Sequence, residues 1–130
     1  MAALSDYAEK LLLDWMMTTG SATRPTAWYV GLFTAAPSDA GGGTEVSGSG
    51  YARQSAAFAA ASSPGGTTSN TADISFTASG GNWGTITHIG IFDASTAGNL
   101  LWHGSMTASK VVNDGDTLQF STGNIDLTIA

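Results

Sequence analysis

The stretch that decides the fold is residues 83–107, WGTITHIGIFDASTAGNLLWHGSMT. Two runs of alternating side chains, residues 85–92 and 100–107, flank a small polar turn. Alternation with a period of two between glycine-rich breaks is typical of a β-hairpin. Because both faces of the two runs carry large apolar side chains, we expect the hairpin to lie centrally in a sheet, with cover on both sides.

The composition predicts one domain with a surface that is poor in charge. The chain has 130 residues, which is enough for a single domain, residues 1–130, with a modest core. Charged residues make up 11% of the chain, against about a quarter in ordinary domains. The net charge is −6, and the scattered cations cannot form a surface that follows phosphates, so we expect no nucleic-acid partner.

The sequence offers no sign of a disulfide, a membrane span or a secretion signal. It contains no cysteine, so disulfides and thiolate metal sites are excluded. The longest apolar run is far shorter than a bilayer span, and the first residues lack the basic-then-apolar order of a signal peptide. We therefore expect a soluble protein made in the cytoplasm of its host, with no membrane partner.

Residues 4–18 carry the clear helical pattern of the chain. Ser5 is a candidate N-cap, and Gly20 is a candidate left-handed cap after the last turn. Leu13 and Met17 widen the apolar face beyond what one sheet can cover. The helix therefore either plugs a β-sandwich or docks partly on a neighbouring subunit. The stripe itself repeats at helical spacing and consists of Leu4, Tyr7, Ala8, Leu11, Leu12, Trp15 and Met16.

The rest of the chain predicts about seven or eight short strands at the spacing of a sandwich. Residues 113–116, Asn-Asp-Gly-Asp, are a strong turn signal, and residues 108–113 are expected to cross between strands. Ile125, Leu127 and Ile129 alternate with polar residues, which predicts one buried face. The fold class is therefore mainly β, an antiparallel β-sandwich or jelly-roll-like domain with one N-terminal helix. Its expected strands are residues 26–34, 51–61, 72–77, 85–92, 100–107, 117–121 and 124–129.

Two long polar segments remain outside this pattern. Residues 35–50 contain five glycines without periodicity, and residues 62–71 contain a Pro-Gly-Gly turn. Segments of this kind are either mobile surface loops or arms that become ordered against a partner. If they dock, the expected interface joins these segments to the outer helix face and comprises Leu13, Met17, Pro37, Asp39, Glu45, Val46, Pro64 and Trp83.

The residues do not assemble into a recognisable catalytic set. His88 and His103 are either separate hydrogen-bonded strand residues, which we favour, or a pair across the hairpin that meets a carboxylate in a small hydrolase. Asp114 and Asp116 fit a hairpin turn better than a calcium loop. Trp83 is the one plausible exposed stacking surface for a glycan, whereas the tryptophans at 28 and 102 suit the core. We expect no enzyme activity, cofactor or metal.

Four segments, in the same order along nearly the whole chain, resemble a small tailed-bacteriophage protein family often labelled tail fibre protein. They are LSDYAEKLLLDW, TRPTAWYVGLFTAAPSDAGGGTEVSGSGYARQ, NWGTITHIGIFDASTAGNLLWHG and NDGDTLQF. The resemblance implies a structural component of the virion without enzymatic activity. It brings no catalytic or ligand-binding motif to any residue.

The position of such a protein in the particle is open at the level of sequence. A fibre needs length, repeats or a coiled-coil stalk, and the sequence has none of these. A compact, acidic, glycine-rich β-domain is more similar to a capsid decoration, or cement, protein. We therefore expect a homotrimer that docks on the major capsid protein and stabilises the head. The alternative is a tail-associated or receptor-binding protein whose partners are tail proteins.

Overall fold

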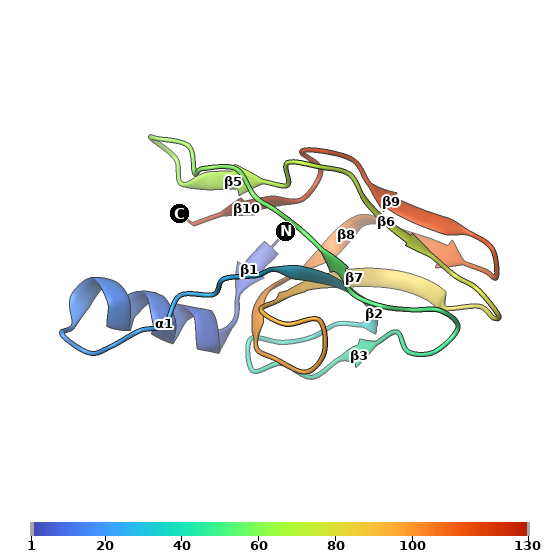
Figure 1. The fold of residues 1–130 in the computed structure, drawn as a ribbon, viewed down its shortest axis with the longest axis horizontal. Coiled ribbons are helices and arrows are strands. Elements are labelled where there is room, and N and C mark those ends of the chain that lie inside the picture. The colour runs from blue at the N-terminus through green and yellow to red at the C-terminus, as the bar shows by residue number, and fades with distance from the viewer. Residues whose placement is uncertain (1, 130) are drawn as a thin grey trace.

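A computed structural model describes residues 2–129 of the chain. Within these residues one helix and ten strands follow one another (Figure 1). In chain order they are β1 (Ala2–Leu4), α1 (Asp6–Met17), β2 (Tyr29–Ala35), β3 (Thr44–Glu45), β4 (Gln54–Ser55), β5 (Thr67–Ser69), β6 (Ile74–Thr77), β7 (Gly84–Phe92), β8 (Leu100–Val112), β9 (Thr117–Phe120) and β10 (Asp126–Thr128).

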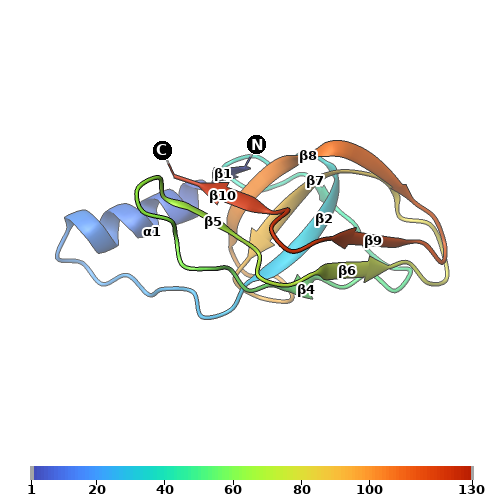
Figure 2. The same ribbon diagram turned by 90° about the horizontal axis from the view of Figure 1, so that it is seen from above.

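The predicted central hairpin is confirmed as β7 and β8. The main sheet has the order β1-β8-β7-β2-β3, and β4 also pairs with β2. β7 and β8 are antiparallel, with Gly90 opposite His103 and Ile91 opposite Trp102. The expected crossing at residues 108–113 is wrong, because β8 bulges and then pairs again, with Val112 opposite Gly84. β8 therefore becomes a long, curved strand (Figure 2).

A second layer of two small antiparallel sheets covers one face of the main sheet. β6 pairs with β9, and β5 pairs with β10. The two ladders lie end to end above β7 and β8 (Figure 1). The architecture is thus mainly β, antiparallel and sandwich-like with a single helix in the described residues, as the sequence predicts.

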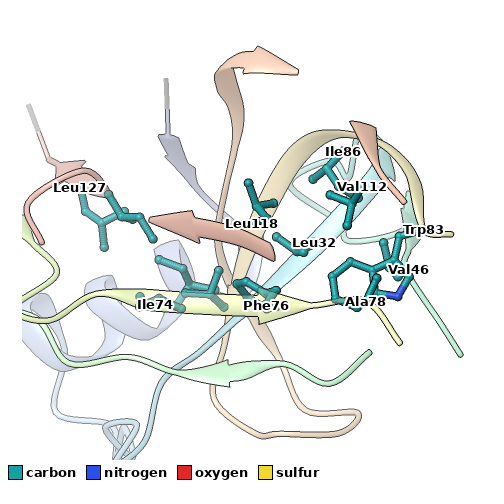
Figure 3. Packing of buried hydrophobic residues seen from close by; sticks show 13 residues of the cluster. Leu32, Val46, Ile74, Phe76, Ala78, Trp83, Ile86, Val112, Leu118 and Leu127 are labelled. Carbon is teal, nitrogen blue, oxygen red and sulfur yellow. The ribbon is translucent and has the colours of Figure 1, made fainter. Parts of the chain in front are cut away.

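The core lies between these layers (Figure 3). Strand alternation explains it: β2 directs Val30 and Leu32 inward, whereas β6 directs Ile74 and Phe76 inward. The aromatic ring of Phe76 stacks on the ring of Tyr51, with 6.4 Å between the ring centroids. The remaining buried members of the cluster are Val46, Ala78, Trp83, Ile86, Ile91, Val112, Leu118, Ile125 and Leu127.

The helix begins and ends differently from the prediction. Ser5 is the N-cap, as expected. Leu4 is not helical, because residues 2–4 form β1 and pair with the edge of β8. Gly20 is not a left-handed cap. The helix ends at Met17, and its C-cap Thr18 is extended, with a φ of −128°. The hydroxyl of Thr18 donates to the carbonyl of Asp14 at 2.8 Å.

Several β segments also differ from expectation. The strand predicted for residues 51–61 is reduced to β4, because its run of alanines has low strand propensity and little side-chain area to pack. Residues 117–121 and 124–129 do form strands, but β9 and β10 pair with different partners rather than with each other. Ile125 and Leu127 are buried, whereas Ile129 is 52% exposed.

The two segments without periodicity pack against the body of the protein. In residues 35–50, Pro37 and Val46 are buried and β3 joins the main sheet. In residues 62–71, β5 pairs with β10. These segments therefore supply cover for their own chain. Among the described residues, no helix has both the length and the apolar character needed to cross a bilayer.

Candidate functional site: an apolar helical arm

The outer face of the main sheet, which points away from the second layer, is covered by its own chain. Gly31 and Gly90 lie opposite each other in β2 and β7, and neighbouring side chains fill the space beside both of them. Phe33 and Phe92 stack there, with ring centroids 6.1 Å apart. A Cβ on Gly90 would lie 2.9 Å from the ring of Phe33, so this packing requires glycine. Phe33 and Phe92 are therefore buried by their own chain, at 3% and 8% exposed.

An ion pair between Glu45 and Arg53, here called the clamp, covers this face at Phe92. The guanidinium of Arg53 lies 3.5 Å from the centroid of the Phe92 ring. Its Nε and Nη2 donate to the two carboxylate oxygens of Glu45, each at 2.8 Å. Its Nη1 donates to the carbonyls of Ala94 and Ala97, at 3.0 and 2.7 Å. One side chain therefore ties the β7–β8 turn to the segment that contains β3.

The clamp shifts the protonation equilibria of its members. Burial alone would raise the pKa of Glu45, but hydrogen bonds from Arg53 and Tyr51 and the positive charge of Arg53 outweigh burial and lower it. Burial, reinforced by the hydrogen bond to Glu45 at 2.6 Å, raises the pKa of Tyr51 well above its ordinary range. Glu45 is therefore ionised and Tyr51 neutral at physiological pH, which suits a structural role.

The arm, residues 6–25, contrasts with this covered face. It consists of α1 and the segment that returns from it toward β2, and it extends beyond the sheets (Figures 1 and 2). Ser5 fixes its base: its backbone N–H donates to Leu101 and its hydroxyl donates to the carbonyl of Leu100. The same hydroxyl accepts from the N–H of Ala8 at 3.2 Å. The arm thus projects from a buried, hydrogen-bonded anchor.

One apolar stripe runs along the helix and loses its cover partway. The central residues of the predicted stripe are Ala8, Leu11, Leu12 and Trp15, which lie on one face at helical spacing. Ala8 is buried against the body, Leu11 and Leu12 are half-buried, and Trp15 is 69% exposed. The loss of cover follows position along the axis, because the helix runs past the end of the sheets while the stripe continues.

The end of the stripe forms a small apolar notch with the returning chain. The notch has a volume of about 210 Å³ and is lined by Leu11, Leu12, Trp15, Ala22, Arg24 and Pro25. Within residues 2–129, no hydrogen bond or ion pair holds the Arg24 side chain, which is exposed and is the one charged residue that lines the notch. Clustered exposed apolar groups of this kind mark docking surfaces.

The eight residues expected at an interface fall into two groups in the structure. Pro37, Val46 and Trp83 are buried, and the latter two belong to the core cluster of their own chain. The other five are exposed or partly exposed, and the carboxylate of Glu45 is paired with Arg53 in the clamp. Leu13 and Met17 are 61% and 73% exposed on the arm, Asp39 contacts His103, and Pro64 is exposed in the loop before β5. Their role in binding stays a prediction.

Trp83 is not the exposed stacking surface that the turn sequence suggested. It is 7% exposed, its indole N–H donates to the carbonyl of Ser49 at 3.0 Å, and its ring meets Tyr51 edge to face. Trp102 is half-buried against the core, as expected of a core residue.

The histidines are separate, hydrogen-bonded strand residues, as favoured from the sequence. His88 lies opposite Ser105 and shares a 2.8 Å hydrogen bond with Thr87, whereas His103 contacts Asp39 at 2.7 Å. The cross-hairpin pair is therefore wrong. In the described part of the chain, no three His, Asp or Glu side chains are grouped as metal ligands would be.

Two important features escaped the sequence reasoning. The sequence leaves open whether the helix face that carries Trp15 is buried, and only the position of the helix relative to the sheets shows that this face is open at Trp15. The sequence assigns Arg53 no role, because its partner Glu45 precedes it by eight residues through an irregular segment. Because charged residues are rare in this chain, a glutamate and an arginine eight residues apart were the one indication of this pair.

These observations define a small, sandwich-like β-domain that buries its sheet faces itself and carries an apolar helical arm. The chain matches the family described as podophage GP4 fiber I protein gp80 over residues 3–128. It belongs to this family, since the match spans nearly its whole length. The chain is accordingly a structural protein of a phage virion. No curated protein sequence matches it.

Proposed function

We propose that the protein is a subunit of a podophage fibre assembly, which joins the virion by docking its arm on a neighbouring subunit. The observation that carries this proposal is the stripe that is buried at Ala8 and open at Trp15. The family name supports the fibre location. A role without catalysis is supported by Glu45 and Arg53, whose charged groups are engaged in the structural contacts of the clamp.

The physical basis of docking is the removal of apolar surface from water. With Trp15 69% exposed, covering its ring removes roughly 170 Å² of surface, an upper limit of about 4 kcal/mol. Ordering of the two partners offsets part of this gain. Because neighbouring subunits are held close together in a particle, mass action favours the docked state. The arm then stabilises the assembly and not the isolated domain.

A second candidate function is decoration of the capsid, in which trimers would bind the major capsid protein. The observation that favours it is the surface itself, which is compact and poor in charge. Such a surface allows many copies to pack closely with few ions to desolvate. Either role places the protein in the virion after synthesis in the bacterial cytoplasm.

Labelling of intact virions separates these candidates. Gold-conjugated antibodies raised against the chain should mark the tail fibres, and quantitative gels should show few copies per particle. Labels spread over the head, with hundreds of copies, would favour decoration. Absence of the chain from purified particles would contradict both roles. As a control, the same antibodies should leave particles of an unrelated phage unmarked.

A further inference from the structure

We infer that the protein binds a neutral saccharide in a hollow beside the base of the arm. The hollow has a volume of about 540 Å³, within the range of roughly 300–1,000 Å³ that is typical of small-molecule sites. It is lined by residues 5–7 at the start of α1, residues 39–42, Phe92 and residues 98–100 at the end of the β7–β8 turn. This surface differs from the stripe, so the inference goes beyond the proposed docking and does not depend on it.

Hydrogen bonds within the chain hold the lining segments in place before any ligand arrives. The backbone N–H of Asp6 donates to the carbonyl of Asp39 at 2.9 Å, which joins the helix to residues 39–42. The carboxylate of Asp93 accepts from the backbone N–H of Asn99 at 2.7 Å and from the side-chain amide of Asn99 at 2.9 Å, which fixes the β7–β8 turn. A site that is formed in advance loses little free energy to ordering when a ligand binds.

The polar groups left open in the hollow are hydrogen-bond acceptors. Within the described part of the chain, the carboxylate of Asp6 has no hydrogen bond or ion pair. Asp39 uses one carboxylate oxygen for His103, at 2.7 Å, and the amide nitrogen of Asn99 is also engaged, which leaves one side-chain oxygen of each residue open. Among the described residues that line the hollow, none is Lys or Arg. The hollow therefore repels anions such as phosphate and selects ligands that donate hydrogen bonds.

An aromatic side chain and apolar neighbours complete the chemistry of the hollow. Tyr7 lines it and is 41% exposed, whereas Phe92 is buried there and Leu100 is half-buried. A pyranose ring has an apolar C–H face that packs on an aromatic ring, and hydroxyls around its edge that donate to carboxylate and amide oxygens. Acceptors on three separate segments fit such a ring, whereas one lysine or arginine side chain of a partner protein would reach only part of them.

The test is a titration of the isotope-labelled chain with four neutral disaccharides, cellobiose, maltose, lactose and chitobiose, followed by the NMR shifts of the backbone amides. At least one of them should cause saturable shifts at residues 5–7, 39–42 and 98–100. Glycerol at the same concentration is the control and should not reproduce these shifts. The absence of saturable shifts with all four disaccharides would overturn the inference. An equal response to glycerol would also overturn it, because it would show an adventitious additive only.

A pair of aromatic substitutions locates the bound saccharide. Tyr7→Ala should raise the Kd at least about fivefold, because it removes the stacking surface. Trp15→Ala is the matched control, since it removes a more exposed aromatic ring from the same helix outside the hollow, and it should leave the Kd within about twofold. The amide spectrum of each variant shows directly that it is folded. Equal effects of the two substitutions would contradict the placement of the site.

A pair of acidic substitutions tests the acceptors. Asp6→Ala should raise the Kd about tenfold, because hydrogen bonds to charged groups are the stronger ones. Glu9→Ala removes an acid from the same first turn of α1 that does not line the hollow, and it should have little effect. Shifts of the same amides with lysine methyl ester, but with none of the disaccharides, would overturn the inference in favour of a basic side chain. Failure of saccharide binding leaves the virion role intact, and absence of the chain from virions leaves the saccharide site intact.

Discussion

The outer face of the main sheet and the helical arm solve the same problem in opposite ways. Both present large apolar side chains beyond the core. The sheet face is closed by the clamp, in which Arg53 covers Phe92 and binds Glu45. The arm has no such cover, and Trp15 remains 69% exposed at its end. The difference teaches that a face of this protein stays open only where no segment of its own chain crosses it, and it is on this open end of the arm that the proposed docking rests.

The largest expected effect concerns the core that supports both regions. Phe76→Ala removes a ring that is 1% exposed and packs edge to face with Phe120. We expect a loss of about 3–5 kcal/mol in the free energy of unfolding, from lost transfer energy and the cavity left behind. Urea denaturation followed by circular dichroism measures it. Tyr7→Ala, an exposed aromatic on the arm, is the control, and a similar loss there would contradict the distinction between body and arm.

The clamp should give the next largest effect. Arg53→Met keeps much of the side-chain length but removes the hydrogen bonds to Glu45 and to the β7–β8 turn. We expect a loss of about 2 kcal/mol, because the partly buried carboxylate of Glu45 is left without its partner. Arg24→Met on the arm is the matched control and should change unfolding by less than about 0.5 kcal/mol. Equal values would show that the clamp contributes no more than an exposed cation.

Substitution of the residue that joins the arm to the body should have an intermediate effect on the free energy of unfolding. Ser5→Ala removes the cap of α1, which accepts from Ala8, and the donor to the Leu100 carbonyl. We expect a loss of about 1 kcal/mol in unfolding free energy. Ser21→Ala, an exposed serine of the same arm, serves as the control in the same denaturation assay. If Ser5→Ala were neutral, the arm would be anchored by its apolar contacts alone.

Acid should weaken the clamp in a defined direction. The pKa of Glu45 is lowered in the folded state, so its ionisation stabilises the fold above the unfolded value of about 4.3. As the pH falls through the lower, folded-state pKa, this contribution is lost. The difference in unfolding free energy between wild type and Glu45→Gln, about 1 kcal/mol at neutral pH, should therefore shrink in acid. A difference that is constant with pH would contradict the role of the charge.

The smallest effect on stability should come from the arm itself. Trp15→Ser should change the unfolding of the dilute chain by less than about 0.5 kcal/mol, because the ring has little cover to lose. The same substitution should reduce incorporation of the protein into particles, as measured by gels of purified virions. A large loss of stability in dilute solution would instead mean that the stripe is covered within one chain.

The comparison also shows how far sequence reasoning reaches. The hairpin of β7 and β8 was predictable because alternation is a local pattern, and the Ser5 cap was predictable because capping is a local hydrogen bond. The pairing of β9 with β6 and the burial of Trp83 were not predictable. Both depend on contacts between segments that are far apart in the sequence, and local sequence patterns do not specify those contacts.

By itself, the sequence determined a charge-poor, mainly β domain with an amphipathic helix, because periodicity and composition act residue by residue. It also determined the family resemblance. Only the tertiary structure decided that Arg53 closes one apolar face and that the helix stripe continues past the sheets to an open end. The physical reason is that burial belongs to no residue alone: the same tryptophan is core or contact according to what the rest of the chain places over it.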